Sequence, residues 1–189
     1  MKKQVIRLTE SDLHKIIKES VRRALNESWF SGKIKVYHYT NERNAQAIMN
    51  GGFKKSKFNT NGGNLYGPAV YLSLDPNREI ALPYGNTIIE GEVYANNAIF
   101  LDFNLAQKFA HMSPSDVVEN INDKLGPEAA QRFTELVERG TPSSIIAYDL
   151  IKEGLLDYKH DIVFNAKRGG PIYVARNVHS ITPLRILNQ

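Results

Sequence analysis

The middle of the chain carries a run of helix-start and helix-stop signals with strand-like stretches on both sides, and this order limits the possible folds most. Residues Asn104 to Gly154 are expected to form three or four short helices. The signals in this interval are Ser113, Gly126-Pro127, Gly140, Thr141-Pro142 and Gly154. A helical block between two groups of strands favours an α+β fold over alternating βαβ units.

The flanking stretches are rich in β-branched and aromatic residues, which favour strands. Those before the helical block are 36–40, the strand within 67–73, 87–94 and 98–103, and those after it are 161–165, 171–176 and 182–187. The glycine-bearing run from Ala166 to Gly170 predicts a hairpin turn. Two further helices are expected among the first strands, one ending at Gly51-Gly52 and one opened by Asp75-Pro76.

The first 30 residues form a separate, basic unit in the sequence. They hold seven Lys/Arg and four Asp/Glu, which is +3 of the total charge of +4, so residues 31–189 are nearly neutral. Thr9 and Asp12 fit a capping box at the start of a helix. The apolar stripe of this helix consists of Leu13, Ile16, Ile17, Val21, Ala24 and Leu25. The stripe either docks on the chain's own domain or makes the helix a separable tag that binds another protein.

Several classes of site are excluded by what the sequence lacks. Without cysteine the chain has no disulfide, thiol nucleophile or thiolate metal ligand. It contains no dinucleotide-binding glycine motif, P-loop, zinc-protease motif or serine nucleophile elbow. The five histidines have no metal-ligand spacing, so no metal is expected. The chain also lacks a bilayer-spanning apolar run and a secretion signal, which predicts a soluble, cytoplasmic protein.

Two short strands carry the residues of greatest chemical interest. In the first, Val36, His38 and Thr40 share one face because side chains alternate along a strand. The second, from Gly67 to Ser73, is a turn followed by a strand that bears Tyr71. Each stretch alone is unspecific, but the pair and the residues that follow each strand are informative.

These motifs resemble those of the ADP-ribosyltransferase superfamily, on its diphtheria-toxin and poly(ADP-ribose) polymerase side. The resemblance covers most of residues 34–103 and 160–187. The matching runs are Tyr37-His38-Tyr39-Thr40, Gly51-Gly52-Phe53, Gly67 to Ser73, Ala81 to Tyr84, Gly91-Glu92-Val93 and Ile172 to Val174. It implies a split antiparallel sheet in residues 31–189, with a helical insertion at about 104–154 and an N-terminal helical extension.

The resemblance also implies that NAD is bound as a substrate. His38 would hydrogen-bond a ribose hydroxyl, and the backbone of Tyr39, where the family usually has glycine, would hold the nicotinamide carboxamide. Tyr71 and Tyr84 would sandwich the nicotinamide ring, since aromatic rings suit stacking. Within the same motifs, the implied NAD-binding set is completed by Thr40, Gly67 and Ser73. The loop from Lys54 to Tyr66 would lie over the donor, with Lys54, Lys55 and Lys57 near its pyrophosphate.

The sequence departs from the polymerising members at Ile172, where those enzymes place a catalytic glutamate. No Asp or Glu follows Asp161 anywhere in the chain. Active relatives with an apolar residue at this position transfer a single ADP-ribose, so the predicted catalytic set is His38, Tyr71 and Ile172. Glu90 and Glu92 imitate the double-glutamate signature of another branch but are interpreted as strand residues.

The resulting hypothesis is an NAD-dependent mono-ADP-ribosyltransferase, a glycosyltransferase-class enzyme, that modifies a protein or nucleic acid. Two alternatives remain open: a catalytically inactive NAD-binding or interaction module, and an RNA 2′-phosphotransferase relative. The nearly neutral domain weakly disfavours the latter. The leader from Arg7 to Ser20 is similar to leaders on unrelated proteins of Bacteroidota and their phages. That similarity favours the separable tag that binds another protein, without identifying the partner. The chain is expected to be phage-encoded or a bacterial effector, acting in the cytoplasm or delivered there from a phage particle.

Overall fold

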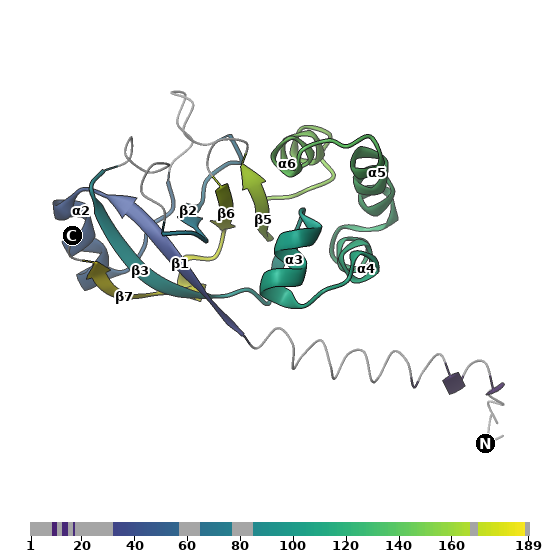
Figure 1. Ribbon diagram of the computed structural model, residues 1–189, viewed down its shortest axis with the longest axis horizontal. Coiled ribbons are helices and arrows are strands. Elements are labelled where there is room, and N and C mark those ends of the chain that lie inside the picture. The colour runs from purple at the N-terminus through teal and green to yellow at the C-terminus, as the bar shows by residue number, and fades with distance from the viewer. Residues whose placement is uncertain are drawn as a thin grey trace, which may run out of the picture.

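The computed structural model describes residues 9, 10, 13, 14, 17, 32–56, 65–76, 85–166 and 170–187. Within them, seven strands form one sheet in the order β4-β5-β6-β2-β1-β3-β7 (Figure 1). The strands are β1 (Lys33–Thr40), β2 (Val70–Ser73), β3 (Thr87–Tyr94), β4 (Ala98–Phe100), β5 (Asp161–Ala166), β6 (Gly170–Ala175) and β7 (Ile181–Leu187). A short 3-10 turn, η3 (Val178–Ser180), precedes β7. The expected α+β class is confirmed.

The sheet consists of two well-paired halves with a short join. β1 pairs with β3 along its whole length, from Lys33 opposite Tyr94 to Thr40 opposite Thr87. Between β1 and β2, by contrast, the register holds a single pair, Tyr37 opposite Ser73. One half is therefore β4-β5-β6-β2 and the other is β1-β3-β7, and the two meet over only a few residues.

The expectation of a purely antiparallel sheet is wrong at one edge. β4 and β5 are parallel, with Ala98 opposite Asp161 and Phe100 opposite Val163. Parallel neighbours need a long crossover connection. The helical block provides it, since residues 103–152 link these two strands. The block consists of α3 (Phe103–Ala110), α4 (Pro114–Leu125), α5 (Pro127–Glu138) and α6 (Ser143–Lys152).

Local signals explain where these helices begin. The Ser113 side chain accepts the main-chain N–H of Asp116, and the Asp116 carboxylate accepts that of Ser113, which is a complete capping box. Pro127 starts α5 directly after Gly126. The predicted strand 98–103 is too long, because the Asp102 carboxylate caps α3 at the N–H groups of Asn104 and Leu105.

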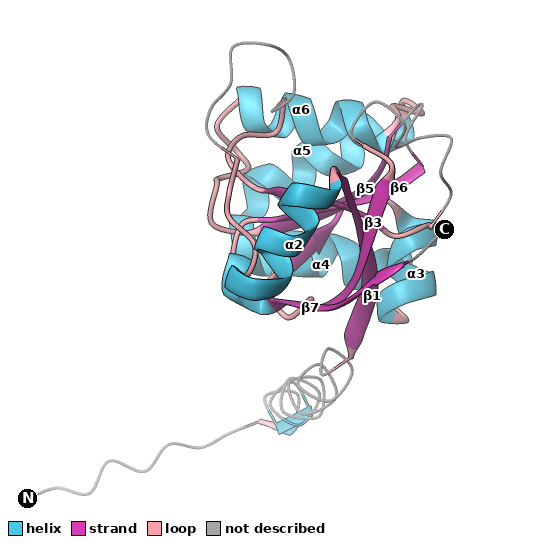
Figure 2. Cartoon of the chain, turned by 90° about the vertical axis from the view of Figure 1, so that its left-hand side faces the viewer, coloured by secondary structure: helices cyan, strands magenta, loops and turns pink. Residues whose placement is uncertain are grey.

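The helices occupy opposite ends of the sheet. Figures 1 and 2 show α2 (Glu42–Gly51) beside β7 at one end, with the helical block beside β5 at the other. A continuous hydrophobic cluster joins the two ends, from Val36 and Ala45 to Phe133, Leu150 and Phe164. A large apolar side chain buried in such a cluster contributes about 1.5–3 kcal/mol. The helical block therefore belongs to the core.

Several predictions fall on residues outside the described ones. These are the helix opened by Asp75-Pro76, with Ala81 and Tyr84, the centre of the loop with Lys57, the turn at 167–169, and most of the N-terminal helix. Two described members of the N-terminal apolar stripe, Leu13 and Ile17, are exposed. No helix in the described part of the chain is long and apolar enough to cross a bilayer.

Candidate functional site

The short join between β1 and β2 brings together the two motif residues that lie 33 positions apart. The His38 Nδ1 atom lies 3.1 Å from the main-chain oxygen of Tyr71. The edge of the imidazole also packs against Phe53, with ring centroids 5.4 Å apart and planes at 89°. The side chain is thus fixed by one polar and one aromatic contact, across a seam where the strands themselves hardly pair.

The surroundings of His38 determine its charge and its tautomer. Burial lowers the pKa of His38 from its ordinary value of 6.5, against a smaller upward effect of the Tyr71 carbonyl. The imidazole is therefore neutral at pH 7. Because a carbonyl oxygen only accepts hydrogen bonds, the contact assigns the proton to Nδ1. The Nε2 lone pair then remains as an acceptor for a hydroxyl group.

Tyr71 carries a fixed phenol. Its hydroxyl donates to the main-chain oxygen of Gly67 at 2.8 Å. Burial is the largest cause that raises the pKa of Tyr71 to about 12, so the phenol stays protonated at neutral pH. Tyr71 can therefore offer a flat ring for contact but cannot act as a base.

Register shows which predicted residues share a face of the sheet. Ser73 pairs with both Tyr37 and Ile172, and residues directly opposite in antiparallel strands point to the same side. Tyr71, two residues before Ser73, lies on that side as well. His38 alternates to the other face, opposite Ile89. Tyr71, Ser73 and Ile172 thus lie on one face, whereas His38 meets this group only at the Tyr71 main chain.

The other members of the predicted NAD-binding set have structural contacts of their own. The Tyr39 hydroxyl lies 3.5 Å from the Asp75 main-chain oxygen, to which Ser73 Oγ donates at 2.5 Å. Thr40 is buried beneath Gly85, where a Cβ would lie 2.3 Å from the Thr40 main-chain oxygen. Gly85 is thus required for this close approach. Tyr84 lies outside the described residues.

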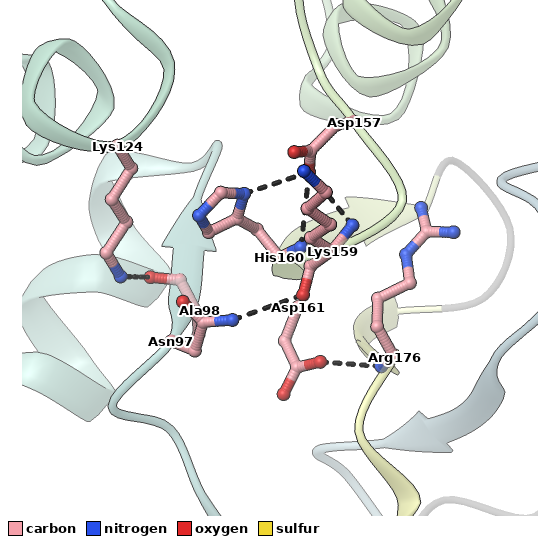
Figure 3. A network of polar contacts seen from close by, with 8 residues as sticks. All are labelled: Asn97, Ala98, Lys124, Asp157, Lys159, His160, Asp161 and Arg176. Atoms are coloured by element: carbon pink, nitrogen blue, oxygen red, sulfur yellow. Dashed lines mark hydrogen bonds and ion pairs between the residues drawn. The ribbon is translucent and has the colours of Figure 1, made fainter.

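A buried polar network lies beside this site, centred on Asp161 at the start of β5 (Figure 3). The Asp161 carboxylate accepts the Tyr173 hydroxyl at 2.8 Å and the main-chain N–H groups of Arg176 and Asn177 at 2.5 and 3.3 Å. Burial raises the pKa of Asp161, and these hydrogen bonds oppose that change. The carboxylate therefore fixes the end of β6, from which the Arg176 side chain extends.

The Arg176 guanidinium itself has no hydrogen-bond partner among the described residues. Arg176 is 2% exposed, and its Cζ atom lies 4.7 Å from the centroid of the Tyr158 ring. In Figure 3 the guanidinium points away from the Asp161 carboxylate, and the drawn contact between the two residues ends on the Arg176 main-chain nitrogen.

Other polar groups near this network are structural. Lys124 donates to the main-chain oxygens of Ala98 at 2.9 Å and Asn96 at 3.3 Å, and so ties α4 to the start of β4. Burial lowers the pKa of Lys124 to about 8. His160 Nδ1 lies 2.9 Å from the Asp157 carboxylate.

Glu90 and Glu92 lie in strand β3, as expected, and both take part in ion pairs. Glu90 lies 3.2 Å from Arg185 and 3.6 Å from Lys35, and Glu92 lies 2.9 Å from Lys33. In the part of the chain that the structure describes, no group of three His, Asp or Glu side chains could hold a metal ion.

Sequence reasoning missed Arg176 and Tyr158. Arg176 was expected only as the last residue of a strand, and Tyr158 lies in the segment between α6 and β5. One signal was available: a single arginine ends the apolar run Ile172-Tyr-Val-Ala175. Lysine and arginine in such positions are mostly solvated, so the burial of this one could not be expected from the pattern.

Comparison with known proteins gives little further guidance. No protein-family model matches the sequence, and no curated protein matches it. Among solved structures, the crystal structure of an anti-CRISPR protein aligns with 82% of this chain and 97% of its own, at 10% identity and a TM-score of 0.35. A likeness at that level carries no argument about fold or function.

Proposed function

We propose that the chain is an NAD-dependent mono-ADP-ribosyltransferase with its donor site at the join between β1 and β2. The observation that supports this is the 3.1 Å contact between His38 Nδ1 and the Tyr71 main chain. It joins the two motifs that carry the sequence resemblance. The single register pair between these strands also agrees with the split sheet that the resemblance implies.

The reaction would break the bond between nicotinamide and ribose and join the ribose carbon to an acceptor atom. The sugar develops oxocarbenium character as the nicotinamide leaves. Tyr71 would contact the nicotinamide ring. The His38 side chain lies on the opposite face of the sheet, so a ribose hydroxyl would have to reach its Nε2 atom through the short seam between β1 and β2. Much of the rate would come from holding NAD in a reactive geometry. Ile172 supplies no base, so the acceptor would lose its proton through its own acidity or to a base from elsewhere.

A second candidate is an NAD-binding module without transfer activity. It is favoured by Ile172, which pairs with Ser73 in the middle of the proposed site and has no ionisable group. In addition, no Asp or Glu follows Asp161 in the sequence. This candidate and the enzyme share the donor site and differ only in turnover.

The experiment uses the full chain with NAD labelled in its adenylate half, with and without a bacterial lysate. Label in protease- or nuclease-sensitive material, together with free nicotinamide, would support transfer. Saturable NAD binding without nicotinamide release would support the module. An RNA with an internal 2′-phosphate forms a third arm, in which loss of that phosphate would identify the phosphotransferase alternative. Absence of NAD binding in every arm would contradict the proposal.

A further inference from the structure

A buried arginine lies next to the proposed site, and its guanidinium makes no hydrogen bond within the described part of the chain. Arg176 is almost fully enclosed, yet its Nε, Nη1 and Nη2 atoms have no hydrogen-bond partner among the described residues. A buried charge that lacks hydrogen bonds is costly even after its surroundings relax. The stack on Tyr158 recovers only part of this cost, since a cation–π contact is weaker than the charge-assisted hydrogen bonds that are missing. The hydrogen-bond donors of the Arg176 guanidinium are thus left without an acceptor among the described residues.

The position of this group is set by contacts on three sides. The Asp161 carboxylate binds the Arg176 main-chain N–H, the Tyr158 ring covers the guanidinium, and Gly67 lies beside both the ring and the guanidinium. A Cβ at Gly67, where φ is +86°, would lie 2.3 Å from the Tyr158 ring and 3.0 Å from Arg176 Nη1. Glycine is therefore the only residue type at position 67 that leaves the Tyr158 ring and the Arg176 guanidinium in place.

The same glycine connects Arg176 to Tyr71. Its main-chain oxygen accepts the Tyr71 hydroxyl at 2.8 Å, while its Cα side faces the guanidinium. Along the chain, Ile172, Val174 and Arg176 alternate onto one side, and Val174 pairs with Tyr71. The unused donors therefore lie next to the ring proposed to contact nicotinamide.

The chemistry of the group indicates what it would bind. A guanidinium presents planar paired N–H donors that match two oxygens of a phosphoryl group or carboxylate. The acidic side chains near it, Asp157 and Asp161, already accept hydrogen bonds from other groups. An incoming oxyanion is thus the partner that would satisfy it. Of the parts of NAD, only the pyrophosphate offers such oxygens.

We propose that the Arg176 guanidinium binds the pyrophosphate of the dinucleotide, and that the half-exposed Tyr158 ring turns away to admit it. The identity of the ligand rests on the proposed function, whereas the anion subsite rests on Arg176 alone. Lys54 and Lys55, which the sequence places near the pyrophosphate, are at an exposed loop and would contribute less.

The test measures binding of NAD, pyrophosphate and nicotinamide to the full chain by calorimetry, in wild type and in Arg176→Met. Methionine keeps an unbranched apolar stem of similar reach and removes the charge. NAD and pyrophosphate affinity should each fall about tenfold or more, as expected for loss of charge-assisted hydrogen bonds. Nicotinamide affinity should change less than twofold. Arg176→Lys should give an intermediate loss, and Arg139→Met, at an exposed site in the helical block, should give none.

Thermal unfolding of the same variants separates binding from structure. If Arg176 is held for a ligand, Arg176→Met removes an unsatisfied buried charge, and its Tm should equal or exceed that of wild type. A large fall in Tm would identify Arg176 as a structural residue and overturn the inference. Equal NAD affinity in wild type and Arg176→Met would also overturn it, while leaving the proposed function intact.

Two outcomes distinguish failure of the proposed function from failure of the inference. If wild type binds pyrophosphate through Arg176 but binds neither NAD nor nicotinamide, the anion subsite stands and the NAD-dependent function fails. If no tested phosphate compound binds, the subsite is overturned as well.

Discussion

The helical block and the join between β1 and β2 differ in how far apart in the sequence their polar partners lie. In the block, side chains close the helix ends locally, as Ser113 and Asp116 do for α4 and Asp102 does for α3. At the join, the His38 ring reaches from β1 to the Tyr71 carbonyl of β2, two strands that share a single register pair. The buried guanidinium nearby has no hydrogen bond in the described part of the chain. The block also holds a buried atom without a hydrogen-bond partner among the described residues, Asn120 Oδ1 in α4, but that atom belongs to a neutral amide, whereas the unpaired group beside the join carries a charge.

The largest effect should come from the core of the block. Phe133 is fully buried and packs edge-on against Phe103, with ring centroids 5.7 Å apart. Phe133→Ala should lower the free energy of unfolding by about 3–5 kcal/mol through lost burial and a residual cavity. Urea denaturation checks this. The NAD affinity of the folded fraction should not change. A fall in NAD affinity as large as the fall in stability would show that the helical block and the join are not independent.

The next largest effect should come from the join. His38→Ala and Tyr71→Ala should each weaken NAD binding by roughly 1–3 kcal/mol, the usual cost of losing one hydrogen-bonding or stacking partner. Tyr71→Phe keeps the ring and loses only the hydroxyl bond to Gly67, so it serves as the matched control and should bind NAD nearly as wild type does. If both alanine variants bind NAD with wild-type affinity, His38 and Tyr71 do not contribute to the NAD site.

The charge of His38 should also appear in the pH dependence of stability. The pKa of this residue is lowered on folding, so the unfolded chain binds the proton more readily. The contribution of neutral His38 is present above the unfolded pKa near 6.5 and is lost as the pH falls through the folded value. The slope cannot exceed about 1.4 kcal/mol per pH unit for one group.

The measurement compares wild type with His38→Gln in urea at intervals from pH 8 to pH 5. Asp161 titrates with the opposite sign, because burial raises its pKa, but this contribution cancels in the difference between the two proteins. The difference in the free energy of unfolding between wild type and His38→Gln should become smaller as the pH falls. A constant difference would mean that His38 does not titrate between these limits.

The smallest effect is expected at a helix cap. Ser113→Ala removes the acceptor for the Asp116 N–H and should cost about 1 kcal/mol in stability. Ser113→Asp preserves a capping acceptor and should restore most of it. Neither change should alter NAD affinity, because the cap belongs to α4 and not to the strands of the join. A binding defect in Ser113→Ala would show that the two regions are coupled.

The accuracy of the sequence predictions follows the range of the interactions involved. The starts of α4 and α5 at Ser113 and Pro127 were predictable because caps and prolines act within a few residues. β3 has the predicted bounds, Thr87–Tyr94, although its burial does not alternate between Ile88 and Gly91. The end of β4 was misplaced because Asp102 caps a helix where the sequence allowed three more strand residues.

Contacts between segments far apart in the sequence could not be predicted from the sequence. The parallel pairing of β4 with β5 joins segments more than 60 residues apart, and no local pattern encodes it. The burial of Arg176 depends on Tyr158 and Gly67, which come from distant segments. In the candidate site, the sequence singled out His38 and Tyr71, but it could not show that His38 reaches Tyr71 through the main chain from the opposite face of the sheet.

Hydrogen–deuterium exchange with and without NAD tests the central claim most directly, because it reports on both regions in one sample. If the donor site lies at the join, saturating NAD should slow exchange in 36–40 and 70–73 and leave the amides of α4, α5 and α6 unchanged. Unchanged exchange at the join, or protection confined to the helical block, would contradict the account.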